Sequence, residues 1–473
     1  MSNHESQGRV GHFYQSVWRW HFYAGLIVAP FLLILSVTGA IYLFNDEIDD
    51  WLYPEQRFVA TQLPALPASQ LIEAALSPFP GATATRLDQP TAPGRSAKVF
   101  ITTAEGEVRK VYVDPGTAQA LGSQVPTETL VGFADVAHGS LLLGEFGDSL
   151  VELMACWSFI LLITGLYLWW PRQSGQWLRL FIPSLSARGR AAWRSWHGVT
   201  GVWSALLLGF LILTGLPWAN VWGDLFRATT DMAGLGYPAY HRSHGARPQS
   251  VVSESSPQAA EATLKQQLGT VPWTLEKQPM PVSDNHAMHQ GAGQGASAQR
   301  LRSGIGIDGA VARLAELGLN PAYRMFLPKD AQGVYTAYTY PNQPQGQRTV
   351  HLDQYSGAVL GDVRYADYGV AAKAVELGVQ LHMGNYFGLA NQLLMLLGCL
   401  GGLVMAISGP VMWWKRRPPG RLAAPRKPAT SQLKTVAWLV VVLGLLFPLA
   451  GASIVLILLL DWLLVRKPGP AVS

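Results

Sequence analysis

The sequence predicts a polytopic α-helical membrane protein, built from two similar halves, with two α+β domains outside the membrane. Charged residues make up 14% of the 473 residues and hydrophobic residues 49%, whereas soluble domains are roughly 25% charged. Apolar stretches of the length that a bilayer crossing needs, about 20 residues, recur along the chain. The polar segments between them are too long to be simple loops.

Five apolar stretches qualify as membrane spans, and the last of them is interrupted by Pro448. That last stretch is therefore expected to be one kinked helix or a re-entrant hairpin. The first is too long for the apolar core of a signal peptide, so we expect it to be retained. The stretches are residues 22–44, 153–171, 198–223, 384–414 and 435–460.

The charges between the spans predict the orientation. Residues 172–194 and 415–434 contain only basic charged residues, whereas residues 45–56 contain only acidic ones. Basic loops stay in the cytoplasm, so the N-terminus is expected to be cytoplasmic and residues 45–146 and 224–381 to lie outside. The small net charge of +5 is thus explained by the basic loops that flank the membrane spans. The expected partner is a lipid bilayer, and no nucleic acid is expected.

These boundaries divide the chain into alternating membrane and polar segments. The cytoplasmic segments are residues 1–16, 172–194, 415–434 and the tail 466–473. The spans, with the histidine segment that precedes two of them, are residues 17–44, 138–171, 195–219, 382–414 and 435–465. The outside segments are residues 45–137 and 220–381, the second with an insert at 224–304 and an α+β domain at 305–370.

Both outside segments show the same order of elements. Residues 71–76 have helical spacing and are followed by strand-like alternation at 97–101 and 108–113. A helix at 309–317 is followed by strands at 334–340 and 348–352. Residues 281–303, rich in Gly, Gln, Ser and Ala, are typical of a linker.

Two sets of residues recur at constant offsets, which indicates an internal duplication. The set that recurs 176 residues later is Trp20, His21, Gly25, Thr38 and Gly39. The set that recurs 244 residues later, with Thr164 matched by Ser408, is His138, Gly144, Gly165, Trp169 and Trp170.

The four histidines of the duplication fall at two depths. His21 and His197 begin helices that leave the cytoplasm, whereas His138 and His382 precede helices that enter from outside. A pseudo-two-fold axis along the membrane normal would bring each pair together inside the bundle. The helix from His21 to Thr38 is about 26 Å long, so most of the hydrocarbon thickness separates the two pairs.

Two imidazoles facing each other in a helical bundle are the ligands of a bis-histidine haem, because iron in a planar macrocycle has two opposite axial positions. Gly25 and Gly201 follow the inner histidines by four residues, and their missing side chains leave room for a macrocycle. We therefore expect two haem b cofactors with His21, His138, His197 and His382 as iron ligands. The Thr-Gly and Ser-Gly steps are interpreted as close contacts between helices.

Two further histidine pairs lie in the second outside segment. His286 and His289 could hold an accessory metal, and His241 and His244 have the same spacing, although solvated polar residues are the simpler interpretation. No phosphate-binding loop, dinucleotide fingerprint or nucleophile elbow occurs. Electrons must therefore come from a quinol or from a cytoplasmic reductase.

The duplicated motifs resemble the PepSY-associated transmembrane family over roughly residues 15–418. Residues 381–388 are especially similar to the family's entry into the fourth span, and the strand ends at Asp114 and Asp353 resemble those of PepSY domains. The family includes bacterial inner-membrane ferric-siderophore reductases with two haems. The resemblance implies that His21, His138, His197 and His382 are the haem ligands. The insert at 224–304 and the extra C-terminal segment depart from the family pattern.

Sequence and resemblance together predict an enzyme, an inner-membrane di-haem b-type oxidoreductase that passes electrons across the membrane to a periplasmic ferric chelate or siderophore. Two alternatives stay open. One is a quinol-linked electron-transfer subunit that serves another periplasmic redox partner. The other is a non-redox PepSY scaffold or regulator in the membrane.

Overall fold

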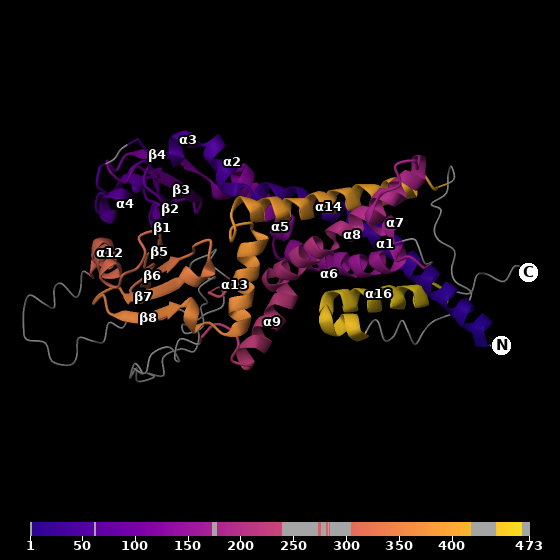
Figure 1. The fold of residues 1–473 in the computed structure, drawn as a ribbon. Helices are drawn as coiled ribbons and strands as arrows, with labels where there is room; N and C mark the ends of the chain where they lie inside the picture. Colours follow the sequence, from indigo (N-terminus) through magenta and orange to yellow (C-terminus); the bar gives the residue numbers. More distant parts are fainter. Residues whose placement is uncertain are drawn as a thin grey trace, which may run out of the picture. The chain divides into compact units, whose positions relative to one another are not determined.

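The computed structural model describes residues 2–60, 63–172, 177–238, 273–275, 281, 283, 304–417 and 441–465 (Figure 1). The chain forms two compact units. The helical unit comprises Met1–Leu43, Ala134–Ala228 and Leu381–Ser473. The sheet unit comprises Phe44–Phe133 and Thr229–Gln380. The acidic segment that follows the first long helix begins the sheet unit.

Four long helices form the helical unit, and all four are long and apolar enough to cross a membrane. They are α1 (Ser2–Tyr42), α6 (Gly144–Trp169), α8 (Gly189–Gly215) and α14 (Leu389–Trp414). Helices α1 and α8 each pack against both α6 and α14, so α1 and α8 are diagonal partners (Figure 1). Four of the predicted spans thus correspond to helices of one bundle.

Small residues let α14 approach both of its neighbours closely. A Cβ at Gly401 would lie 2.4 Å from the Cβ of Ser204 on α8, and a Cβ at Gly402 would lie 2.3 Å from the Oγ of Ser36 on α1. No real Cβ tolerates such distances, so these two positions require glycine. Close approach through small residues is the usual way in which helices associate in lipid, where burial of apolar surface provides little driving force.

Two of the long helices are preceded by a short helix that ends at or near a histidine. Helix α5 (Leu130–Ser140) ends two residues after His138, and α13 (Val370–His382) ends at His382. The chain then turns before α6 and α14 begin. Positive φ angles mark both turns, at Leu141 (51°), Leu142 (62°), Gly144 (60°), Gly384 (79°) and Gly388 (59°). The two leucines adopt a conformation that costs of the order of 1 kcal/mol each, so the surrounding packing must impose this bend.

The last apolar segment folds back on itself. Residues 441–446 are helical, and α16 (Pro448–Val465) begins after a break at Phe447. A Cβ at Gly451 would lie 2.3 Å from the Cα of Gly444, a separation that a continuous helix cannot give over seven residues. The segment packs on α6, where Trp157 Nε1 donates to Ser453 Oγ at 3.1 Å. Of the two expected forms, a kinked helix and a hairpin, the described residues have the geometry of the hairpin.

The sheet unit contains one antiparallel sheet of eight strands, in the order β4-β3-β2-β1-β5-β6-β7-β8. The first four strands are β1 (Thr83–Asp88), β2 (Ala97–Thr102), β3 (Val108–Val113) and β4 (Ala120–Gln124). The second four are β5 (Arg324–Phe326), β6 (Val334–Thr339), β7 (Arg348–Asp353) and β8 (Val359–Arg364). The prediction of two separate domains is wrong, because β1 pairs with β5 and joins both halves into one sheet (Figure 1).

One face of this sheet carries the apolar core. Helices α4 (Ala68–Leu76) and α12 (Gly306–Glu316) both cover that face (Figure 1). Leu71 of α4 and Leu314 of α12 pack with Leu87, Val99 and Met325 of the strands, and all five are almost fully buried. The alternation of buried and polar residues along β2 explains why this face was recognisable from the sequence.

His351 of β7 is a buried histidine outside the helical unit. Its ring is 4% exposed, and its Nδ1 lies 2.9 Å from the Oγ1 of Thr336 on β6. Burial lowers the pKa of His351 from 6.5 to about 4. The unfolded chain therefore takes up this proton at a higher pH than the folded sheet.

We predict that the sheet unit is fully stable above about pH 6.5 and loses about 3 kcal/mol between pH 6.5 and pH 4 through His351. Hydrogen exchange of the β6 and β7 amides, expressed as protection factors in the full chain, measures this. His351→Gln should remove most of the pH dependence over that range. Equal pH dependence in the wild type and in His351→Gln would contradict the assignment.

Candidate histidine-pair site

Each of the four duplicated histidines uses its ring Nδ1 in a hydrogen bond with a hydroxyl group on another long helix. The distances are 2.9 Å for His21–Thr164, 3.0 Å for His138–Thr38, 2.6 Å for His197–Ser408 and 2.8 Å for His382–Thr214. All eight residues belong to the helical unit. The same interaction therefore occurs four times in one bundle.

These bonds are reciprocal within each half of the chain. In the first half, His21 on α1 bonds to α6, and His138, which precedes α6, bonds back to α1. In the second half, α8 and α14 are linked in the same way by His197 and His382. Each half is thus a pair of long helices joined by two histidine–hydroxyl hydrogen bonds, one near each end of the pair.

The hydroxyl groups determine which ring nitrogen carries the proton. Thr38 Oγ1 donates to the carbonyl oxygen of Ile34 at 2.8 Å, and Thr214 Oγ1 donates to that of Phe210 at 2.7 Å. Thr164 and Ser408 make the equivalent bonds. A hydroxyl has one proton, so each of these oxygens can only accept from the histidine. This bonding pattern favours the tautomer with the proton on Nδ1 and the lone pair on Nε2.

A free Nε2 lone pair beside an anchored Nδ1–H is the usual state of a metal-binding histidine. The four hydroxyl bonds to these rings all use Nδ1. His138 and His382 also hydrogen-bond the backbone of Leu35 and of Leu211. The arrangement therefore fixes the tautomer and the ring position and leaves one nitrogen of each ring for a ligand.

The glycine after each hydroxyl residue makes room for the ring. A Cβ at Gly165 would lie 3.1 Å from His21 Cε1, and one at Gly39 would lie 3.2 Å from His138 Cε1. The corresponding distances are 3.6 Å for Gly215 with His382 and 3.9 Å for Gly409 with His197. These steps are close contacts between helices, as interpreted, and at Gly39 and Gly165 the missing side chain also leaves room for the imidazole ring.

The two histidines of each depth come from opposite sides of the bundle. His21 and His197 lie on the diagonal helices α1 and α8. His138 and His382 precede α6 and α14, and their ring centroids are 6.5 Å apart with an interplanar angle of 81°. A metal bound to two imidazoles at about 2 Å from each nitrogen would separate the centroids by about 6 Å. The outer pair thus has the spacing of two axial ligands of one iron.

Gly25 and Gly201 differ in their surroundings. Among the described residues, nothing outside the local helix backbone lies within 4 Å of a Cβ built on Gly25. A Cβ on Gly201 would lie 3.3 Å from the Cε and 3.5 Å from the Sδ of Met405 on α14. A side chain at Gly25 would thus meet no neighbouring residue among those described, whereas the flexible thioether of Met405 lies beside Gly201.

The histidines of the predicted accessory metal site all lie outside the described residues. They are His286 and His289, with His241 and His244 as the second pair. Within the described residues no group of three or more His, Cys, Asp or Glu side chains could hold a metal ion. Cys156 and Cys399 are free and buried. The histidine pairs are thus the ligand sets that the structure offers.

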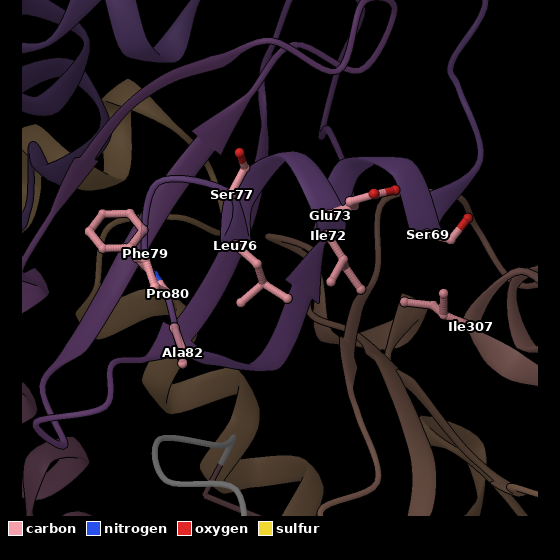
Figure 2. Close-up of a pocket in the computed structure, with 10 residues that line it drawn as sticks. Ser69, Ile72, Glu73, Leu76, Ser77, Phe79, Pro80, Ala82 and Ile307 are labelled. Atoms are coloured by element: carbon pink, nitrogen blue, oxygen red, sulfur yellow. The ribbon is translucent and has the colours of Figure 1, made fainter.

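Two cavities among the described residues lie at different distances along the chain from the four histidines. A hollow of about 610 Å³ is lined by α4, the turn after it and Ile307 of α12 (Figure 2), and its walls contain none of the four histidines. A groove of about 460 Å³ between α1 and α14 is lined almost entirely by apolar side chains, and Leu26, in its wall, is five residues from His21. This groove lies in the same unit as the histidine pairs.

The helix bundle defines a polytopic membrane protein that contains two histidine pairs. The chain belongs to the PepSY-associated TM region family, whose model matches residues 18–416. No curated protein matches the sequence. The family assignment predicted from the duplicated motifs is confirmed.

The sequence analysis missed the hydrogen bonds that the hydroxyl residues form with the four histidines. The sequence did contain a signal for these partners. In each long helix the hydroxyl residue lies at the end opposite to the histidine that begins or precedes that helix. Thr38 follows His21 by 17 residues and Thr214 follows His197 by the same number. That placement brings each hydroxyl to the level of the other histidine of its half.

We predict that Thr214→Val destabilises the protein by about 1 kcal/mol, because the His382 ring loses its hydroxyl partner and keeps only the backbone carbonyl of Leu211. Thr214→Ser keeps the hydroxyl and should be close to wild type. Thermal unfolding of the full chain in detergent measures the effect. Thr200→Val, on the same helix, is the matched control, and equal destabilisation by both valine variants would refute the role of Thr214.

Proposed function

We propose that the two histidine pairs hold two haem b groups, and that the protein is a bacterial inner-membrane oxidoreductase that reduces a ferric chelate on the periplasmic side. The observation that carries this proposal is the outer pair. His138 and His382 lie 6.5 Å apart between ring centroids, and hydroxyl groups hold Nδ1 of both rings. Each ring thus has Nε2 left for an axial bond to iron.

Haem bound at these two depths would supply reversible one-electron transfer within the bundle. The protein's own residues would position the histidine rings. The hydroxyl groups bond Nδ1 of His21 and His197 as they do Nδ1 of the outer pair, and Gly39 and Gly165 pack closely against two of the rings. The rings are partly buried among apolar helices. Such rigid ligand sets favour fast electron exchange because little has to reorganise.

The proposed net reaction moves one electron from a donor on the cytoplasmic side to Fe(III) in a chelate outside. Fe(III) is a hard ion that oxygen ligands hold tightly, whereas Fe(II) is softer and is held more weakly. Reduction therefore releases iron without breaking a bond of the chelator. The choice of a ferric chelate follows from the family resemblance, and the sidedness follows from the basic loops at 172–194 and 415–434.

The groove between α1 and α14 favours a quinol as the electron donor. Its lining includes Ala29, Leu33, Ala406 and Trp413 and is almost wholly apolar. A volume of about 460 Å³ lies in the usual range for small-molecule sites. A lipid-soluble donor would reach such a groove from the bilayer, so we propose it in preference to a cytoplasmic reductase. The same groove would serve the alternative of a quinol-linked subunit for another periplasmic partner.

We predict that reduced-minus-oxidised spectra of the purified protein show low-spin b-type bands. His382→Ala should lose about half of the haem, because one of two sites loses an axial ligand. His351→Gln, which changes a buried histidine of the sheet, is the control and should keep the full amount. Unchanged haem in His382→Ala would refute the ligand assignment, and absence of a Soret band in the wild type would leave the non-redox scaffold.

We further predict that chemically reduced protein is reoxidised by ferric chelates in the absence of any partner protein. Stopped-flow absorbance of the haem bands after mixing with Fe(III) chelates, and with the corresponding Ga(III) chelates as a redox-inactive control, measures this. Reoxidation by Fe(III) alone supports the reductase. Slow reoxidation by every ferric chelate would favour the electron-transfer subunit for a periplasmic protein.

A further inference from the structure

The face of the sheet opposite α4 and α12 carries charged and aromatic side chains in its central strands. Strand alternation places these side chains on one face, because the residues between them, such as Leu87, Val99 and Met325, belong to the apolar core. We call this group the central strip. It consists of Arg86, Asp88, Lys98, Phe100, Lys110 and Arg324.

The strand register makes the members of the central strip direct neighbours. Asp88 is paired with Lys98 on one side and with Arg324 on the other. Phe100 is paired with Arg86 and with Lys110. Cross-strand pairs of this kind have Cβ atoms about 5 Å apart, so four cations and one carboxylate share a small area.

This part of the face is not an ordinary solvated surface. Three aromatic side chains next to the strip are almost fully buried on the same face, since Tyr112 is 0%, Tyr338 1% and Phe326 3% exposed. The Arg86 guanidinium lies 3.6 Å above the Phe100 ring. Charges beside buried aromatic rings are less screened than charges in water, so an uncompensated charge is costly there.

The carboxylates near the strip are already engaged. Asp88 forms two hydrogen bonds with Arg86, at 2.7 and 3.1 Å. On the flank, Asp46 and Asp50 bind Arg57 of α3 (Pro54–Arg57), and Asp50 also binds Arg95. Asp49 also bonds Arg57 and acts electrostatically on Lys98 and Lys110. These four carboxylates are outnumbered by the six cations around them, Arg57, Arg86, Arg95, Lys98, Lys110 and Arg324.

Lys98 is the cation of the strip that has no direct carboxylate contact. Among the described residues it forms no hydrogen bond and no ion pair within 4 Å, and Asp88, Asp46 and Asp49 act on it only at longer range. Burial, with the nearby charges of Arg57 and Lys110, lowers the pKa of Lys98 to about 8. The amine is thus still mostly protonated at neutral pH, and a negative charge placed beside it would be strongly favoured. Arg324, whose side chain is 47% exposed, is a second cation of the strip and lies 4.0 Å from Asp88, which already binds Arg86.

We propose that the central strip binds an anionic, oxygen-rich ligand, which in terms of the proposed function is a ferric chelate with net negative charge. Lys98 and Arg324 would contact its oxygen atoms, and Phe100 would pack against its flat parts. Neutral and cationic chelates would be rejected, because they leave the cations unpaired. This inference rests on the proposed function only for the identity of the ligand.

The test uses Ga(III) chelates, which match Fe(III) in charge and ligands but are not reduced, so that binding is measured without electron transfer. Titration calorimetry of the full chain with an anionic Ga(III) catecholate or citrate should show binding that weakens with salt. Lys98→Gln and Arg324→Gln should each weaken it about tenfold or more. Arg313→Gln, which removes a cation from the α12 side of the same sheet, should leave it unchanged.

Three outcomes would overturn the inference. They are no binding of any anionic Ga(III) chelate, equal binding of a neutral Ga(III) hydroxamate, and undiminished binding in both strip variants. Haem spectra of the same samples separate this result from the proposed function. Chelate binding without haem would refute only the oxidoreductase, and haem without chelate binding would refute only the ligand site.

Discussion

The hydrogen bond between a histidine Nδ1 and a hydroxyl on the partner helix is the interaction on which the bundle and its proposed chemistry both depend. It satisfies a polar ring nitrogen inside an apolar unit, where an unpaired group would be costly. It also favours the tautomer with the proton on Nδ1, so that Nε2 keeps a lone pair that can bind a metal. The bond occurs four times, for example between His138 and Thr38, and it ties together the helices of each half. The same hydrogen bond therefore contributes to the stability of the bundle and to the orientation of the histidine rings.

Much of the fold could be predicted because the strongest sequence signals are local. Apolar length identified four long helices, and alternation identified strands such as β2 and β7. The pairing of β1 with β5 could not be predicted, since β5 has only three residues and its partner lies more than 200 positions away. The turns after His138 and His382 were also missed, because Leu141 and Leu142 are not residues that usually adopt positive φ.

The candidate site was partly predictable for a different reason. The duplication placed His21 with His197 and His138 with His382, and only a symmetric bundle was needed to bring them to two depths. The partners of the rings were not predictable from composition, because a Thr-Gly step in a membrane helix more often serves packing. The charged strip around Lys98 was also missed, since its neighbours are set by strand register across two halves of the chain.

The most direct test of this account is an experimental structure of the protein purified from membranes at a resolution that shows the histidine rings. The account predicts flat density for a macrocycle between His138 and His382, a second between His21 and His197, and Nδ1 of every ring on its hydroxyl. Rings that bond to the same hydroxyls but enclose only side chains or water would contradict it. In that case the four histidine–hydroxyl bonds would be structural, and the proposed electron transfer would have no carrier.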